Sequence, residues 1–230
     1  LGGYIEKKYE SESIPEIEDS ILAEEYWGLL SAETKKNSPW MIDSVIHALG
    51  REREKSLKTL DKVNLITTTS PFFEPEWQSW SISQNWWFYK YVIQNFDVYA
   101  TRPNIIVWKR RKTVIDFKQS KCDVINGNSI SLDGPPGYYD VRIKYKFPGN
   151  SRKLLLLQNG ISTGGNANGK VSLNPKGETG SFPIAKADHF LKVYRLEWYP
   201  NSSKPYIESC VSKRIPPQAW IVFGHNEKLT

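Results

Sequence analysis

Residues 139–147 read Tyr-Asp-Val-Arg-Ile-Lys-Tyr-Lys-Phe, the cleanest alternation of apolar and polar side chains in this chain of 230 residues. Successive side chains of a β-strand point to opposite faces of a sheet, so the pattern predicts a strand with one face on a core. The other face would present three cations in a row. The two sets are Val141, Ile143, Tyr145 and Phe147 on the core side, and Asp140, Arg142, Lys144 and Lys146 on the other.

Turn signals surround this strand and divide the rest of the chain into short pieces. Asn126-Gly127 and the segment 133–137 are typical of tight turns. Further strands are predicted at 63–69, 96–101, 105–108, 113–117, 130–132, 154–157, 190–198, 206–211 and 220–223. Short strands separated by Gly and Pro predict a mainly β fold, a β-sandwich or jelly-roll-like core with a helical N-terminal appendage. An α+β sheet is the alternative.

The N-terminal third has helical rather than strand-like periodicity. Residues 1–37 are predicted to form an acidic, partly helical arm, because Ile17, Ile21, Leu22, Tyr26 and Leu29 recur at helical spacing. Residues 38–60 are predicted to be a helical segment that begins at Ser38-Pro39. Residues 61–230 would then form a basic, β-rich core domain. The arm either packs on its own domain or mediates self-association, and the latter predicts a homo-oligomer.

Large aromatic rings are concentrated in residues 63–117, which should form a major part of the core. The segment 74–91 fits both a helix and a strand, and we expect a short helix followed by a strand. The aromatic stretch contains four consecutive cations, which must face water or an anionic partner. They are Lys109, Arg110, Arg111 and Lys112.

The net charge of +6 is unevenly distributed, with −4 in residues 1–60 and +10 in the remainder. Such an excess suggests that nucleic acid or an anionic membrane surface is the partner of the basic part. The plainer interpretation is that the basic residues form a solvated face that only keeps the protein soluble. The candidate anion-binding residues are Lys109, Arg110, Arg111, Lys112, Arg142, Lys144, Lys146, Arg152 and Lys153.

These features favour a non-enzymatic structural protein that self-associates through its arm and meets an anionic partner through its basic face. The layout resembles that of viral matrix or coat proteins, in architecture rather than in any motif. The sequence does not determine the location, and a cytoplasmic or virion-associated one is favoured. The alternative is a secreted carbohydrate-binding protein or glycoside hydrolase with exposed tryptophans, in which Glu74, Glu76 or Glu197 would supply polar groups.

Other motifs are sparse, and no cofactor or metal is expected from them. Cys122 and Cys210 lie too far apart for a short metal-ligand spacing, and they are compatible with one disulfide or with two buried thiols. Pro135-Pro136-Gly137-Tyr138 matches the P-P-x-Y string that WW-type domains bind, although a turn between strands explains it equally. No apolar run reaches the roughly 18 residues that a membrane-spanning helix requires.

Overall fold

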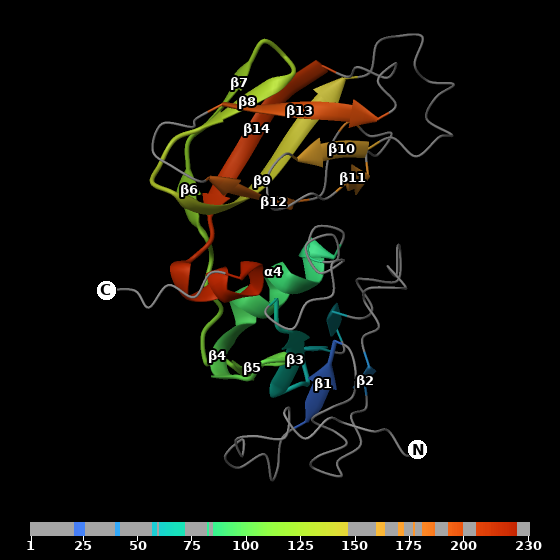
Figure 1. Cartoon of the computed structure of the whole chain (residues 1–230), viewed down its shortest axis with the longest axis vertical. Coiled ribbons are helices and arrows are strands. Elements are labelled where there is room, and N and C mark those ends of the chain that lie inside the picture. The colour runs from blue at the N-terminus through green and yellow to red at the C-terminus, as the bar shows by residue number, and fades with distance from the viewer. Residues whose placement is uncertain are drawn as a thin grey trace. The chain divides into compact units, whose positions relative to one another are not determined.

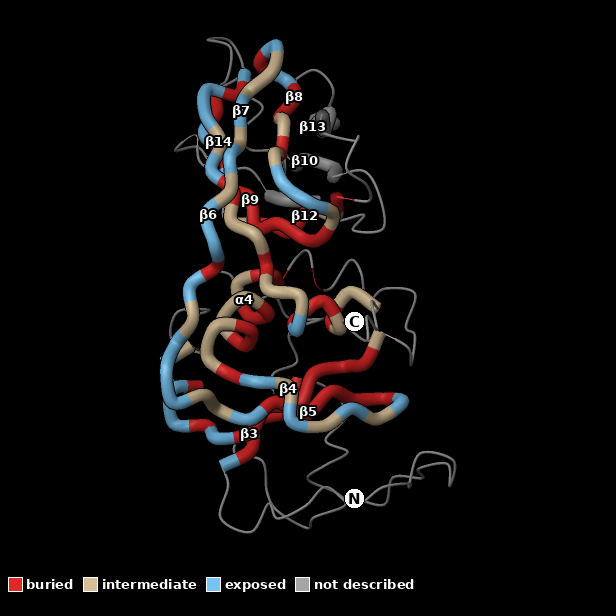
Figure 2. The backbone as a smooth tube through the Cα atoms, turned by 90° about the vertical axis from the view of Figure 1, so that its left-hand side faces the viewer, coloured by how far each residue is buried: buried red, intermediate tan, exposed pale blue. Residues whose placement is uncertain are grey.

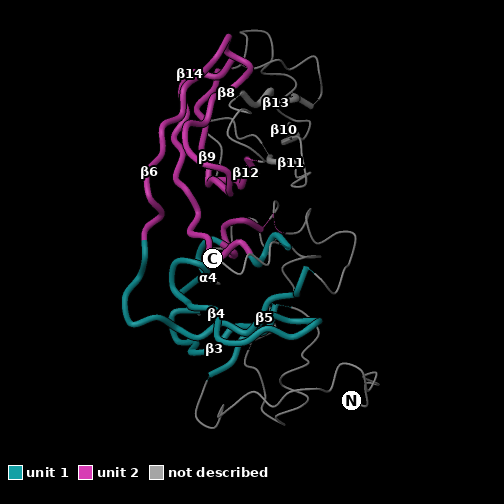
Figure 3. Tube along the Cα trace, turned by 60° about the vertical axis from the view of Figure 1, so that its left-hand side comes forward, with its two compact units in different colours: residues 1–78, 90–115, 221–225 teal, residues 79–89, 116–220, 226–230 magenta. Residues whose placement is uncertain are grey.

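The computed structural model describes residues 21–25, 40–41, 57–58, 60–71, 82, 85–146, 160–163, 170–172, 177, 181–186, 193–199 and 206–224. The described chain is mainly β, as predicted, with short strands and few helices (Figure 1). It divides into two compact units (Figure 3). Unit 1 comprises residues 1–78, 90–115 and 221–225, and unit 2 comprises residues 79–89, 116–220 and 226–230.

Unit 1 contains a five-stranded mixed sheet in the order β2-β1-β3-β5-β4. The first three strands in this order are parallel, whereas β5 is antiparallel to both β3 and β4. The helix α4 (Trp86–Asn95) leads directly into β4. The strands are β1 (Leu22–Glu24), β2 (Trp40–Met41), β3 (Leu65–Thr69), β4 (Phe96–Thr101) and β5 (Ile105–Arg110).

The central strands of unit 1 are buried on both faces (Figure 2). One face holds a cluster of Leu22, Leu65, Ile105 and Val107. On the other face the indole Nε1 of Trp108 donates to Thr68 Oγ1 at 2.9 Å, which satisfies a buried donor. Continuous burial explains why β3 and β5 contain apolar and β-branched runs instead of an alternating pattern.

The predicted N-terminal helix is wrong at Leu22–Glu24, which form the parallel strand β1. Leu22 and Ala23 are both buried, and a short apolar run in a parallel strand cannot be distinguished from a helix by periodicity. The helix predicted from Pro39 is likewise wrong at Trp40–Met41, where β2 pairs with β1. Near the end of the segment predicted to be helical, residues 57, 58 and 60 are helical, as predicted, and Ile21 and Glu25 flank β1 without regular structure. The other residues of both predicted helices lie outside the described residues.

The strand predicted after Asn85 is also wrong, because the chain forms α4 there. The rings of Trp86, Phe88 and Tyr89 and the side chain of Val92 are all buried on this helix. Tertiary burial therefore outweighs the preference of aromatic residues for strands.

Two further predicted strands are absent from the described chain. Residues 113–117 have no regular structure, and residues 220–223 belong to the 3₁₀-helix η5 (Pro217–Phe223). Pro216 and Pro217 lack amide donors for a sheet ladder, and Trp220 Nε1 instead donates to the carbonyl of Ile215 at 3.0 Å.

Unit 2 contains two antiparallel sheets, in the orders β11-β10-β13-β8-β7 and β12-β9-β14-β6. The first sheet comprises β7 (Cys122–Ile125), β8 (Ser129–Leu132), β10 (Gly160–Thr163), β11 (Lys170–Ser172) and β13 (Val193–Tyr199). The second comprises β6 (Lys118–Ser120), β9 (Gly137–Lys146), β12 (Phe182–Lys186) and β14 (Tyr206–Arg214). Both sheets contribute to one hydrophobic cluster, which consists of Ile130, Leu132, Tyr139, Val141, Ile143, Tyr145, Phe182, Ile184 and Ile207.

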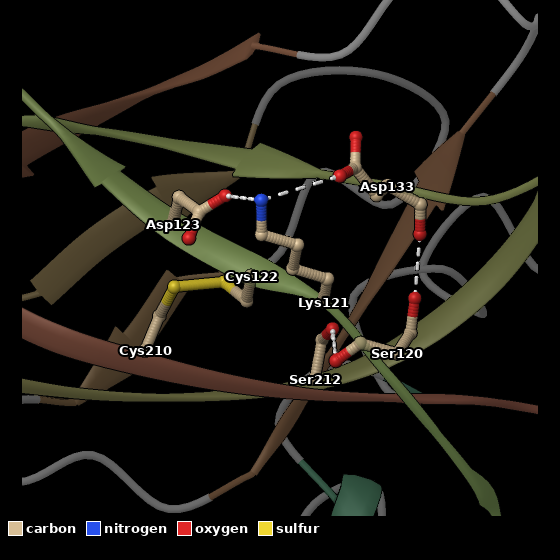
Figure 4. Close-up of a disulfide and its surroundings, with 7 residues drawn as sticks. All are labelled: Ser120, Lys121, Cys122, Asp123, Asp133, Cys210 and Ser212. Carbon is tan, nitrogen blue, oxygen red and sulfur yellow. Dashed lines mark hydrogen bonds and ion pairs between the residues drawn. A yellow bond between two sulfur atoms is a disulfide. The ribbon is translucent and has the colours of Figure 1, made fainter.

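The chain passes from one sheet to the other at Lys121, between β6 and β7 (Figure 4). Directly after this crossing, Cys122 forms a disulfide with Cys210 on β14, with 5.7 Å between the two Cα atoms. Both cysteines pack against the hydrophobic cluster. The bond therefore connects β7 of one sheet to β14 of the other. The sequence was compatible with one disulfide or with two buried thiols, and the structure has the disulfide.

The disulfide should contribute substantially to stability because it closes a long loop. Cys122 and Cys210 are 88 residues apart. In the chain-entropy model, replacing both by Ala should lower the free energy of unfolding by about 4–5 kcal/mol. Urea unfolding of the double variant and of the parent measures this difference. A reductant should bring the parent to the stability of the variant, and a parent that is insensitive to reductant would contradict the bond.

Candidate anion-binding surface

Strand β9 has the alternation that its sequence predicts. Val141, Ile143 and Tyr145 are buried in the cluster, and the three cations between and after them are exposed. These cations are Arg142, Lys144 and Lys146. Asp140 lies on the same side of the strand as these cations, but it is buried. Its Oδ1 accepts a hydrogen bond from Trp86 Nε1 at 2.8 Å. The exposed cationic row therefore begins at Arg142, with about 6.6–6.8 Å between successive cations along the strand.

The neighbouring strand β14 completes this surface. Directly opposite residues of antiparallel strands share a face, and the register pairs each cation with one exposed residue of β14. A bulge between Ile207 and Ser209 separates the last pair from the first two. We call the resulting surface the basic sheet face, and its pairs are Arg142 with Val211, Lys144 with Ser209, and Lys146 with Tyr206.

Acidic side chains offset only part of this charge. The Lys146 ammonium forms an ion pair with Glu208, which lies in the bulge. In the next row of the sheet, Lys213 Nζ contacts both carboxylate oxygens of Asp116, at 2.8 and 2.7 Å. Within the described residues Arg142 makes no ion pair, and its cross-strand neighbour is an uncharged valine. Arg142 therefore keeps an exposed positive charge in the described part of the sheet.

The disulfide lies behind the basic sheet face. Cys210 is opposite Ile143 on the buried side of β14, between Ser209 and Val211 on the exposed side. Its bond to Cys122 fixes this part of β14 against β7 (Figure 4). The spacing between the cations of β9 and their β14 neighbours is set by the ladder of hydrogen bonds, and the covalent link holds β14 to the other sheet.

The four consecutive cations of unit 1 have different roles from one another. Arg110 turns inward, where its Nε donates to the carbonyl of Val63 at 2.6 Å and its Nη2 donates to the carbonyl of Leu60. The same guanidinium stacks over the Phe96 ring at 4.5 Å. Arg111 donates from Nε to the Phe96 carbonyl at 2.9 Å and pairs with Asp97 at 2.8 Å. Both arginines therefore bind their own chain.

Only Lys109 and Lys112 of this group are exposed. Lys109 lies over the ring of Tyr99, with 5.2 Å from Nζ to the ring centroid. The two lysines belong to unit 1 and the basic sheet face belongs to unit 2, so each group is considered by itself. Arg152 and Lys153, predicted as neighbours of the cationic strand, lie outside the described residues.

The P-P-x-Y string forms the turn into β9 and is not displayed as an extended ligand. Tyr138 is buried, with its ring 5.9 Å from that of Trp220, and burial raises its pKa to about 12. The carbonyl of Pro135 accepts a hydrogen bond from the Tyr139 hydroxyl at 2.6 Å. A WW-type domain binds an exposed polyproline segment, and in this fold the tyrosine of the motif is part of the interior.

Three of the described tryptophans are buried and cannot belong to a sugar-binding platform, and a fourth, Trp87, is half-buried. Trp86, Trp108 and Trp220 are buried, and the nitrogen of each donates to an acceptor within its own unit. Glu74 and Glu76 lie outside the described residues, and Glu197 is described only as part of the backbone of β13.

The described part of the chain contains neither a cluster of metal ligands nor a membrane-spanning helix. No three His, Cys, Asp or Glu side chains gather there as metal ligands. None of the helices in that part of the chain has the length and apolar character to cross a membrane.

Comparison with models of known families, with curated protein sequences and with solved structures found no match.

Sequence reasoning identified the cations of this surface but missed its apolar members. Val211 and Tyr206 are 52% and 60% exposed, whereas the sequence pattern predicts only that both belong to a strand. The sequence does contain a signal for the exposure of Val211. Because Val211 follows Cys210 directly on a strand, the two side chains must point to opposite faces of the sheet. Using this signal would have required knowing that Cys210 faces inward.

Because Arg110 points inward and Lys112 is exposed, replacing each of them should affect stability differently. Arg110→Gln should lower the free energy of unfolding by about 2–4 kcal/mol, because two buried carbonyls lose a charged donor. Lys112→Gln, an equal change of charge at an exposed position, should stay within about 0.5 kcal/mol of the parent. Urea unfolding measures both, and equal stabilities of the two variants would contradict the inward geometry.

Tyr138 should make the stability of the protein fall at alkaline pH. Its pKa is about 12 in the fold, against about 10 in an unfolded chain. The unfolded state therefore loses the proton first, so stability is retained below about pH 10 and falls by up to about 2–3 kcal/mol as pH rises toward 12. Tyr138→Phe should lack this part of the fall, whereas Tyr99→Phe, at an exposed ring, should behave as the parent in urea unfolding.

Proposed function

We propose that this chain is a non-enzymatic binding protein whose basic sheet face contacts an anionic partner, either nucleic acid or an anionic membrane surface. The observation that carries this proposal is the exposed row of Arg142, Lys144 and Lys146, each beside an uncharged residue of β14. A regular row of cations on a stiff strand suits a partner with repeated negative charges.

The chemistry of the row supports binding rather than catalysis. Lysine and arginine side chains remain protonated at neutral pH, so they attract anions without exchanging protons. The hydroxyl of Ser209 lies opposite Lys144 in the register of the face. Activating such a hydroxyl as a nucleophile would require an adjacent general base, and the neighbouring carboxylate of Glu208 instead forms an ion pair with Lys146.

The finer architecture and the biological role are also proposals. The hydrophobic cluster that both sheets of unit 2 share supports a sandwich-like packing of those sheets. A viral matrix or coat function, with self-association through residues 1–37, would fit a protein that displays one charged face. If the arm were exchanged between two copies, the β1 strand of one copy would have to take the place of β1 in the other, between β2 and β3.

The Cys122–Cys210 disulfide indicates in which kind of compartment the protein would carry out the proposed function. Disulfides persist in secreted proteins and on virion or cell surfaces and are rare in reducing cytosol. The bond therefore favours the virion-associated location over the cytoplasmic one. It also fits the secreted carbohydrate-binding alternative, but the buried Trp86, Trp108 and Trp220 give that alternative no support.

Binding of a polyanion should depend on salt and on the cationic row. A labelled single-stranded oligonucleotide, followed by fluorescence anisotropy, should bind more weakly as salt rises. The double variant Arg142→Gln with Lys144→Gln should reduce the slope of log affinity against log salt by about 1.5, since roughly two counterions fewer are released. The charge-matched control is Lys58→Gln with Lys62→Gln, two exposed lysines of unit 1.

The control should retain the slope of the parent. If both double variants reduce the slope equally, the binding reflects net charge alone and the basic sheet face is not a specific surface. If neither the oligonucleotide nor anionic vesicles bind to the parent at low salt, the proposed function is wrong.

A further inference from the structure

Five large apolar side chains are exposed in the described part of the chain, namely Ile21, Tyr99, Val114, Tyr206 and Val211. Two of them, Tyr206 and Val211, belong to the basic sheet face. Single exposed apolar residues are common on protein surfaces and need no explanation. Two on the same face as three cations are a different observation, because a face that serves only to keep a protein soluble gains nothing from them.

The register places the two kinds of side chain next to each other. Val211 is directly opposite Arg142, and Tyr206 is directly opposite Lys146. Side chains in such pairs lie about 4.5–5.5 Å apart at Cβ. The cations of β9 therefore form one row, and the apolar residues lie beside both ends of that row on β14.

The apolar residues are also held in place. The Tyr206 ring lies against the β7–β8 turn, where a Cβ added to Gly127 would come within 2.1 Å of it. The amide of Ile207 donates to the Gly127 carbonyl at 2.7 Å. Val211 follows Cys210, whose disulfide fixes the strand. Tyr206 and Val211 are thus presented to an approaching surface on a rigid support.

Nucleic acid and lipid would use this face differently. Phosphates of a nucleic acid would engage the cations, and a base could stack on Tyr206, but Val211 has no flat ring for stacking. A bilayer uses both kinds of residue, because anionic headgroups attract cations while apolar and tyrosine side chains enter the interfacial layer. The combination of Val211 with Arg142 therefore favours lipid.

We infer that the basic sheet face docks on an anionic lipid surface, with Arg142, Lys144 and Lys146 at the headgroups and Val211 and Tyr206 in the interfacial layer. This inference rests on the proposed function and selects one of its two partners. The ion pair with Glu208 reduces the contribution of Lys146 to the electrostatic attraction.

Vesicle sedimentation tests this inference, with vesicles of phosphatidylcholine alone and of phosphatidylcholine mixed with phosphatidylserine. The parent should bind the mixed vesicles and not the neutral ones. Arg142→Gln with Lys144→Gln should weaken binding roughly 30-fold, about fivefold for each cation. Val211→Thr keeps the β-branched shape and should weaken binding about fivefold by removing an apolar contact. Circular dichroism establishes that each variant is folded.

The matched control for Val211 is Val114→Thr, at another exposed valine, which lies in unit 1. This control should bind the mixed vesicles as the parent does. If Val211→Thr also binds as the parent does, the lipid inference is wrong. If the oligonucleotide still binds in a manner that depends on Arg142 and Lys144, the proposed function stands with nucleic acid as the partner. Failure of both probes to bind the parent would overturn the inference and the proposed function together.

Discussion

Burial of one side of β9 is the constraint on which the rest of unit 2 depends. Val141, Ile143 and Tyr145 enter the cluster that both sheets share, and burying each such side chain contributes about 1.5–3 kcal/mol. Because side chains alternate along a strand, this burial forces the residues between them outward. Arg142 and Lys144 are exposed for this reason, and the proposed binding surface is a consequence of how the core is packed.

The disulfide extends this constraint to β14. Cys210 lies on the buried side of its strand, so Ser209 and Val211 must lie on the exposed side, beside the cations of β9. A face assembled in this way has a fixed spacing before any partner arrives, which lowers the entropic cost of binding. The lipid-docking inference gains from this rigidity, because the apolar and the cationic residues are positioned together.

The strand-rich fold and the cationic strand could be predicted, but several elements could not. Strands β3, β4, β5, β8, β9, β13 and β14 coincide with predicted strands, because β-branched runs and alternation are local signals. Strand β1 and helix α4 were missed because burial on several sides removes the periodicity that distinguishes helix from strand. The four consecutive cations of unit 1 were read as one surface, yet Arg110 and Arg111 satisfy backbone carbonyls of their own unit. The likeness to viral matrix or coat proteins stays an architectural expectation.

The sequence by itself determined the alternation of residues 141–146, and with it the exposure of Arg142, Lys144 and Lys146, because a strand admits only two faces. Only the tertiary structure decided what lies beside that row and what lies beneath it. The register of β14, the Cys122–Cys210 bond and the inward turn of Arg110 all join residues far apart in the chain. No local pattern encodes such pairings, because they depend on which distant surfaces can be packed together.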